Sequence, residues 1–270
     1  MASQWDSGDE LDELELSFDA LNALEWVDAA VTTTEPAWVV AMQRFHDAGA
    51  LADPAHSRSE RLRQLVILCE LGGHARAFGD AMREAGVIDM CLAAMPALDL
   101  AEPADMPLLL MCCRTVRKII CPDRVSRKRV REVGGLPALI RALDSGVEAV
   151  AMEATHCIKN SCYGQTDSRN EVRELGGVHA MMRVLLTPHY TNATWRAAVA
   201  LCGLSWANPA NRDIITTWPG VMEAIELRLG QKQETWKTAT GLRALRRHMV
   251  LRASGQQVGN SDEEEEEEDL

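Results

Sequence analysis

Two stretches of the chain read almost alike: Glu132-Val133-Gly134-Gly135-Leu136-Pro137-Ala138-Leu139-Ile140-Arg141-Ala142-Leu143 and Glu174-Leu175-Gly176-Gly177-Val178-His179-Ala180-Met181-Met182-Arg183-Val184-Leu185. Gly135 and Gly177 lie 42 positions apart, a spacing that is typical of helical repeats. Weaker copies place Gly220 a further 43 positions on and Gly86 49 positions before Gly135, and Asp47-Ala48-Gly49-Ala50 is a candidate fifth copy. The pattern predicts a solenoid of about four to five repeats, an architecture that offers an extended binding surface rather than a catalytic pocket.

Each part of the best repeat has a physical reason. The Gly-Gly pairs let the backbone take a positive φ and turn sharply out of a short helix. Pro137 fits the first turn of the next helix, where its missing N–H is no loss. A polar link then leads into a longer helix over residues 147–162, whose small inward-facing side chains let neighbouring helices approach closely. These inward-facing residues are Val150, Ala151, Ala154, Cys157 and Ile158.

The composition favours an all-α protein. Apolar residues make up 47% of the chain, which is enough for a substantial core, and β-branched runs with period two are missing. No apolar run approaches the roughly 18 residues that cross a bilayer, and the N-terminus has acids where a secretory signal has bases. The eight cysteines lack the regular spacing of a disulfide framework, so we expect reduced core residues. We expect the protein in the cytoplasm or the nucleus, with no membrane partner.

The net charge of −12 is distributed in blocks. Residues 1–35 hold ten acids and no Lys or Arg, and Asp262–Asp269 add eight more acids, so the rest of the chain carries all 28 Lys and Arg against 22 acids. We expect residues 1–35 to form an acidic segment with a helix that caps the first repeat, or alternatively a detachable helix that docks on a partner. Residues 36–252 then form the repeat domain, and residues 253–270 form a disordered acidic tail.

A basic body between two acidic ends favours either an acidic ligand or association of the ends with the body. We expect the acidic tail to screen the basic surface in cis and to raise the threshold for an acidic partner.

Three features together resemble the armadillo repeat: a short helix ending in Gly-Gly, a second helix that starts Leu136-Pro137-Ala138-Leu139, and a long Ala-rich third helix. The resemblance is strong over residues 131–229 and weaker over residues 38–130 and 231–252. A HEAT-like arrangement is the alternative, which the Gly-Gly turn and the three-helix rhythm disfavour. The resemblance implies an all-α, right-handed superhelix whose third helices line a concave groove that holds a partner segment.

Peptide-binding members of this family, such as importin-α, carry Trp-x-x-x-Asn on the third helices. The matching positions here hold the pairs His156 and Asn160, Arg114 and Lys118, and Val199 and Gly203, so only Asn160 keeps the family residue. A groove lined by arginine and lysine repels a basic cargo and favours an acidic or mixed-charge segment. The candidate partner-binding residues are Arg114, Arg117, Lys118, His156, Lys159 and Asn160.

Residues 114–131 form the densest positive segment of the chain. It is interpreted as a solvated basic face or as a docking patch for an acidic protein. Nucleic-acid binding is a less favoured use, because the overall charge is acidic and no aromatic row accompanies the cations. A third reading of the whole chain is a structural subunit of a larger assembly, in which the ends of the solenoid make the contacts.

Patterns for catalysis and metal binding are weak. His156 and Cys157 with Cys162 lack the fourth ligand and the Cys-x₂-Cys spacing of a structural zinc site. The chain has no phosphate-binding Gly-rich loop and no Gly-x-Ser-x-Gly motif. We therefore expect a non-enzymatic adaptor or scaffold with no cofactor, no metal and no catalytic residues.

Overall fold

The computed structural model describes residues 76–121, 124–206, 208–230 and 236–253. Within these ranges the regular structure is helical, with no β-strand. The expectations for the acidic segment 1–35, for the candidate fifth copy at residues 47–50 and for the acidic tail beyond residue 253 lie outside the described residues.

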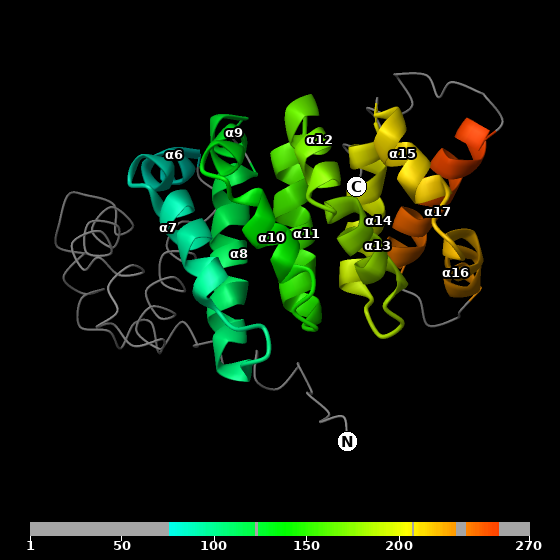
Figure 1. The fold of residues 1–270 in the computed structure, drawn as a ribbon, viewed down its shortest axis with the longest axis horizontal. Coiled ribbons are helices and arrows are strands. Elements are labelled where there is room, and N and C mark those ends of the chain that lie inside the picture. The colour runs from blue at the N-terminus through cyan, green and yellow to red at the C-terminus, as the bar shows by residue number, and fades with distance from the viewer. Residues whose placement is uncertain (1–75, 122–123, 207, 231–235, 254–270) are drawn as a thin grey trace.

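The described helices form four consecutive three-helix units (Figure 1). The short first helices are α6 (Arg76–Glu84), α9 (Arg124–Glu132), α12 (Thr166–Glu174) and α15 (Pro209–Thr216). The second helices are α7 (Val87–Ala94), α10 (Leu136–Ala142), α13 (Gly177–Leu186) and α16 (Val221–Leu229). The long third helices are α8 (Met106–Ile120), α11 (Glu148–Cys162), α14 (Asn192–Ser205) and α17 (Trp236–Ala253).

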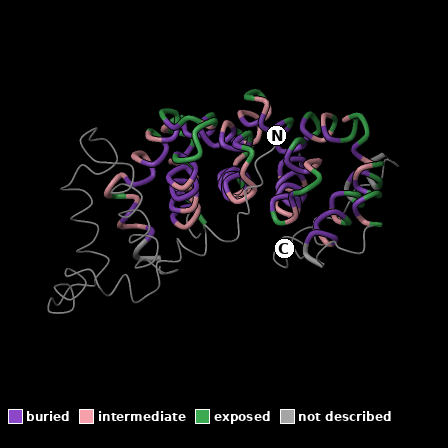
Figure 2. Tube along the Cα trace, turned by 90° about the horizontal axis from the view of Figure 1, so that it is seen from below, coloured by how far each residue is buried: buried purple, intermediate pink, exposed green. Residues whose placement is uncertain are grey.

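The third helices pack side by side in one layer, α8 on α11, α11 on α14 and α14 on α17. Figure 2 shows the row of helices bending into an arch. We call the exposed side of α8, α11, α14 and α17 the inner face. The chain is thus an all-α superhelical solenoid, as the repeat pattern predicted.

The core follows the predicted inward stripe. Val150, Ala151, Ala154, Cys157 and Ile158 are all completely buried. Burial raises the pKa of the Cys157 thiol, which donates a hydrogen bond to a backbone carbonyl of α8, so this cysteine is a protonated core residue. None of the helices in the described ranges combines the length and the apolar character that a membrane span requires.

The glycines of each repeat have two separate tasks. Gly134 and Gly176, the first glycine of each pair, have φ of 67° and 76°, the left-handed conformation that ends a helix. Gly86 and Gly220 have φ of 73° and 74° and match this first glycine. The sequence alignment, which set Gly86 and Gly220 against the second glycine, is therefore wrong by one residue.

The second glycine of a pair lies where two helices approach closely. A Cβ at Gly135 would lie 2.3 Å from Cδ1 of Leu92. A Cβ at Gly177 would lie 2.7 Å from Cγ1 of Val172 and 2.9 Å from the carbonyl oxygen of the same residue. The pair thus combines a turn that requires a positive φ with a contact that leaves no room for a side chain.

Replacing Gly177 by alanine should lower the free energy of unfolding by about 2–3 kcal/mol, because the methyl group overlaps backbone as well as side-chain atoms. Gly176→Ala is the matched variant: its Cβ meets open space, so only the positive φ opposes it, at a cost of about 1 kcal/mol. Urea unfolding of both variants measures the difference. A larger loss for Gly176→Ala would contradict the assignment of the two tasks.

The link between α7 and α8 spans residues 95–105 and contains two 3₁₀ turns, over Met95–Ala97 and Pro103–Asp105. The helix α8 begins at Met106, and Pro107 belongs to its first turn, where a residue without an N–H is tolerated.

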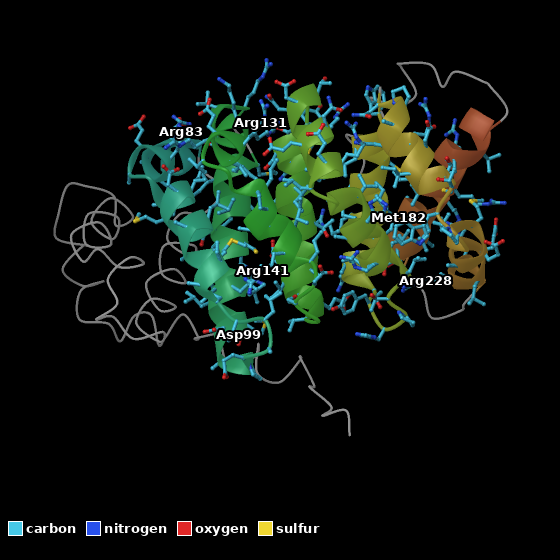
Figure 3. All side chains as sticks on the ribbon, in the orientation of Figure 1. Arg83, Asp99, Arg131, Arg141, Met182 and Arg228 are labelled. Atoms are coloured by element: carbon cyan, nitrogen blue, oxygen red, sulfur yellow. The ribbon has the colours of Figure 1, made fainter. Side chains whose placement is uncertain are left out.

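Arginines in the last turns of successive second helices reach back to the preceding repeat, where each binds the link between the second and third helices. Arg141 donates to the carbonyl oxygens of Met95 (3.2 Å) and Leu98 (2.7 Å) (Figure 3). Arg183 makes a bidentate ion pair with Asp144 at 2.8 and 2.9 Å. The corresponding residue of α16, Arg228, is buried with only 8% of its surface exposed. These contacts fasten each repeat to the one before it.

Candidate functional site

The six predicted partner-binding residues lie on two neighbouring third helices. Arg114, Arg117 and Lys118 belong to α8, and His156, Lys159 and Asn160 belong to α11. All six are half-buried. Spacings of three and four residues put them on one side of each helix, and α8 and α11 pack against each other.

An acidic residue that the sequence reasoning did not select organises this group. The carboxylate of Glu153 on α11 is 3.3 Å from Nε of Arg114 and 2.5 Å from Nε of Arg117. Glu153 is only 4% exposed, and a buried carboxylate needs such partners because water does not solvate it. Two guanidinium groups share one carboxylate, so the pair of helices keeps a positive charge.

The next third helix adds a cation and an aromatic ring. The guanidinium carbon of Arg196 on α14 lies 3.9 Å from the ring centroid of Trp195, a cation–π contact. Burial lowers the pKa of Arg196, and the charge of Arg117 lowers it further. Nε of Arg196 is enclosed and meets no hydrogen-bond acceptor among the residues that the structure describes. Arg196 therefore extends the cationic group from α8 and α11 to α14.

His156 stands between these cations as a neutral ring. Burial lowers its pKa from 6.5 to about 3, and the charges of Arg196, Arg117 and Lys159 act in the same direction. At neutral pH the imidazole is uncharged and can either donate or accept one hydrogen bond at each nitrogen, according to its tautomer.

The depressed pKa of His156 predicts a loss of stability in acid. The unfolded chain takes up this proton near pH 6.5 and the folded protein only near pH 3, so the free energy of unfolding falls as the pH drops below about 6.5. The contribution is at most about 1.4 kcal/mol per pH unit. Urea unfolding between pH 7 and pH 5 should show a shallower acid slope for His156→Asn than for the unmodified protein, and equal slopes would contradict the low pKa.

Asn160 lies one helical turn beyond His156 on α11. Its Nδ2 is enclosed, and no acceptor within the described ranges is close enough to bind it. Enclosed amide and guanidinium nitrogens without acceptors are costly in isolation. Asn160 and Arg196 thus each hold a buried nitrogen, on adjacent helices, that no acceptor among the described residues satisfies.

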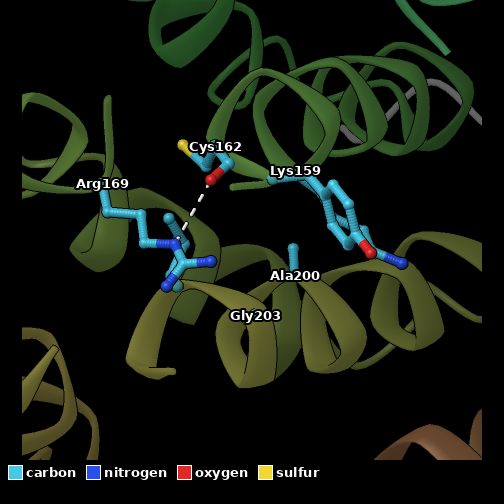
Figure 4. A pocket seen from close by; sticks show the side chains of 7 residues that line it. Lys159, Cys162, Arg169, Ala200 and Gly203 are labelled. Atoms are coloured by element: carbon cyan, nitrogen blue, oxygen red, sulfur yellow. Dashed lines mark hydrogen bonds between the residues drawn. The ribbon is translucent and has the colours of Figure 1, made fainter. Parts of the chain in front are cut away.

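A shallow pocket lies between the C-terminal ends of α11 and α14 (Figure 4). It is lined by Lys159, Cys162, Tyr163, Arg169, Ala200, Gly203 and Leu204. Arg169 donates to the carbonyl oxygens of Cys162 (3.2 Å) and Trp206 (2.7 Å) and so ties the ends of the two helices together. Lys159 lines the pocket, so the pocket continues the candidate site toward the C-terminal ends of α11 and α14.

The basic segment 114–131 does not form one patch. Its first part lies on α8 at the inner face and its second part on α9 in another layer. On α9, Arg127 donates to the carbonyl oxygens of Ile120 and Cys121, Arg129 pairs with Asp89, and Arg131 pairs with Asp167 and Glu171. The α9 arginines therefore hold repeats together, and the single continuous basic face that the sequence suggested is a wrong interpretation.

Within the described residues, no group of three or more His, Cys, Asp or Glu side chains is placed to hold a metal ion. His156 and Cys157 point to different surroundings, since the imidazole is half-buried and the thiol is fully enclosed. What the inner face offers is a set of donors and cations, suited to binding oxygen acceptors.

The architecture is similar to that of solved armadillo repeat proteins. A designed armadillo repeat protein aligns with a TM-score of 0.61 and 14% identity, over 82% of this chain and 97% of its own. A second one, in complex with peptide (KR)4, aligns with a TM-score of 0.62 and 16% identity, over 86% and 93%. The armadillo repeats only protein ARO from Plasmodium falciparum aligns with a TM-score of 0.59 and 13% identity, over 80% and 99%. No family model and no curated protein matches the chain.

Proposed function

Because the chain has an armadillo-like fold, we propose that it is a non-enzymatic scaffold that binds an extended segment of another protein on its inner face. One observation carries the proposal: on neighbouring third helices, the guanidinium groups of Arg114, Arg117 and Arg196 lie around the single buried carboxylate of Glu153, so cations outnumber anions there. An extended peptide segment with acidic side chains supplies carboxylate oxygens that such cations bind.

The charge of the inner face supports an acidic or mixed-charge segment. Arg114, Arg117 and Arg196 lie around one buried carboxylate, that of Glu153. Lys118 follows Arg117 on α8, and the charge of Lys159 acts on His156 of α11. A designed neighbour was solved with the basic peptide (KR)4, whereas a basic peptide would meet repulsion on this face. His156, which is uncharged at neutral pH, adds hydrogen-bonding capacity without adding charge.

Nucleic-acid binding is the second candidate function, because the same cations could neutralise phosphates. The arginines of α9 argue against it, since they are engaged in contacts between repeats. The inner face offers Trp195 as an aromatic surface for a base, but Arg196 already covers its ring.

Fluorescence anisotropy with four labelled probes tests the proposal: an acidic decapeptide, the peptide (KR)4, a single-stranded oligonucleotide and a duplex. We expect the acidic peptide to bind at least about tenfold more tightly than (KR)4 at low salt, with an affinity that weakens as salt screens the charges. Micromolar binding of an oligonucleotide with a steep salt slope, and no binding of the acidic peptide, would instead support the nucleic-acid function.

Arg196→Gln should weaken binding of the acidic peptide by about threefold to tenfold, because it removes a charged donor from the centre of the site. The control is Arg183→Gln: Arg183 also carries a guanidinium group, but it lies on α13, is half-exposed and pairs with Asp144. The control should bind the peptide like the unmodified protein. Equal losses in both variants would indicate a general charge effect and contradict the assigned site.

A further inference from the structure

The inner face carries more positive than negative charge, and the chain itself contains a segment of the opposite charge. Asp262–Asp269 are eight consecutive acids. On the inner face, Arg114, Arg117 and Arg196 surround a single buried carboxylate. Opposite charges on one chain attract each other at a high effective concentration, because the connecting residues keep them together.

The tether is long enough for contact. The helix α17 ends at Ala253, and the eight residues between it and Asp262 span up to about 26 Å when extended. Packed helices lie 8–10 Å apart, and α17 packs on α14, which packs on α11. Arg196 on α14 is thus about 10 Å from the axis of α17, and Lys159 on α11 is about 20 Å from it.

The direction of α17 also suits such a contact. In Figure 1 the C-terminal end of α17 lies at the same edge of the molecule as α12 and α15, the helices that follow α11 and α14. Lys159 and Asn160 belong to the last turn of α11. The described structure therefore ends, at Ala253, at the edge where the last turns of α8 and α11 carry Arg117, Lys118 and Lys159, whereas Arg196 lies in the first half of α14.

We propose that residues 262–269 bind in cis on the inner face, across Arg196 and Lys159 toward Lys118, and compete there with an acidic partner segment. The competition rests on the proposed function, because it requires an acidic partner segment. The contact in cis requires no partner. The carboxylates of the acidic segment pair there with the cationic side chains of α8, α11 and α14, which share only the carboxylate of Glu153. Residues 262–269 therefore exclude acidic ligands that bind weakly. Acidic ligands that bind more tightly than the tethered acids displace them.

Zero-length carbodiimide crosslinking of the full chain at low protein concentration tests the contact without any partner. Carboxylates of residues 262–269 should crosslink to Lys159 and Lys118 within one molecule. Lys128 on α9 is the control lysine, since its side chain is 64% exposed but lies outside the inner face. Crosslinks mainly to Lys128, or mainly between two molecules, would overturn contact in cis.

A charge-neutralised variant, with the eight acids of residues 262–269 replaced by Asn and Gln, tests the competition. At an effective concentration near millimolar and an intrinsic dissociation constant of roughly 100 µM for the tethered acids, the variant should bind the labelled acidic decapeptide about tenfold more tightly than the full chain. The difference should disappear at high salt. Unchanged affinity at low salt would overturn the competition.

The two proposals fail in different ways. If the acidic decapeptide binds neither protein while the intramolecular crosslinks to Lys159 and Lys118 persist, the proposed partner class is wrong and the contact in cis stands. If the decapeptide binds both proteins equally and the crosslinks are missing, the proposed function stands and the contact in cis is wrong.

Discussion

Arg228→Met should lower the free energy of unfolding by about 3–4 kcal/mol. The guanidinium of Arg228 donates to the carbonyl oxygens of Thr187 and Tyr190 and to the hydroxyl of Thr194. The side chain is only 8% exposed, and a hydrogen bond to a charged group contributes about 1.5–3 kcal/mol. The carbonyl oxygens of Thr187 and Tyr190 each retain one other donor, the N–H of Tyr190 and the hydroxyl of Thr194, which limits the loss. Methionine retains most of the apolar stem, so the measurement reports the lost donors rather than a cavity.

Arg183→Met is the matched control, because Arg183 occupies the corresponding turn of the preceding second helix. Its ion pair with Asp144 is half-exposed, with side-chain exposures of 53% and 49%, and such surface pairs contribute less than about 1 kcal/mol. Urea unfolding monitored by circular dichroism measures both variants. Similar decreases in the free energy of unfolding for the two variants would contradict the view that burial makes the Arg228 contact the most stabilising of these contacts between repeats.

Glu153→Gln should change stability and binding in opposite directions. The substitution removes the negative charge that Arg114 and Arg117 share, at a cost of about 1–3 kcal/mol in unfolding free energy, because the amide accepts only weaker hydrogen bonds. The inner face becomes more positive, so the affinity for the acidic decapeptide should rise by about threefold to tenfold. Urea unfolding and anisotropy on the same preparation measure both effects.

The control for Glu153 is Glu148, the first residue of the same helix. Glu148 accepts hydrogen bonds from the backbone N–H groups of Thr191 (2.6 Å) and Ala193 (3.1 Å) and so caps α14 from a neighbouring repeat. Glu148→Gln should cost about 1 kcal/mol, as the loss of a capping charge does, without raising peptide affinity. An affinity that falls in Glu153→Gln would contradict the role of this carboxylate as the charge that limits anion binding.

Much of the fold could be predicted because local rules and tertiary packing agree. Gly134, Pro137 and the stripe from Val150 to Ile158 each satisfy a turn, a helix start or a buried face that follows from sequence alone. The one-residue error at Gly86 and Gly220 arose because the two tasks of a Gly-Gly pair are indistinguishable in sequence. Only the backbone conformation tells which glycine has the positive φ.

The candidate site was predictable only in part. The repeat register selected residues of α8 and α11, which do lie on neighbouring helices. Glu153 and Arg196 were missed because their importance comes from contacts between residues far apart in sequence. Glu153 is bound by two arginines of the preceding third helix. Arg196 is largely buried, and the charge of Arg117 acts on it. A signal was available for Glu153, since an acid among the inward-facing alanines of a helix requires a cationic partner.

The interpretation of residues 114–131 as one basic face was wrong for a related reason. Residues 114–131 are adjacent in sequence, but the end of α8 separates two environments. Arg131 pairs with Asp167 and Glu171 of the next repeat, whereas Arg117 faces the inner layer. A run of cations that crosses a helix boundary in a solenoid is divided between layers, so its charge cannot be assigned to one surface.

The central claim, that an acidic segment binds on the inner face, is tested most directly by identifying the residues that an acidic peptide contacts. An acidic decapeptide with a photoreactive group at its centre is crosslinked to the full chain and to the charge-neutralised variant, and the labelled residues are identified by mass spectrometry. The account predicts labelling of α11 and α14 around His156, Lys159 and Arg196, stronger in the variant than in the full chain. Labelling concentrated on α9 and α12, with the inner face unlabelled in both proteins, would contradict it.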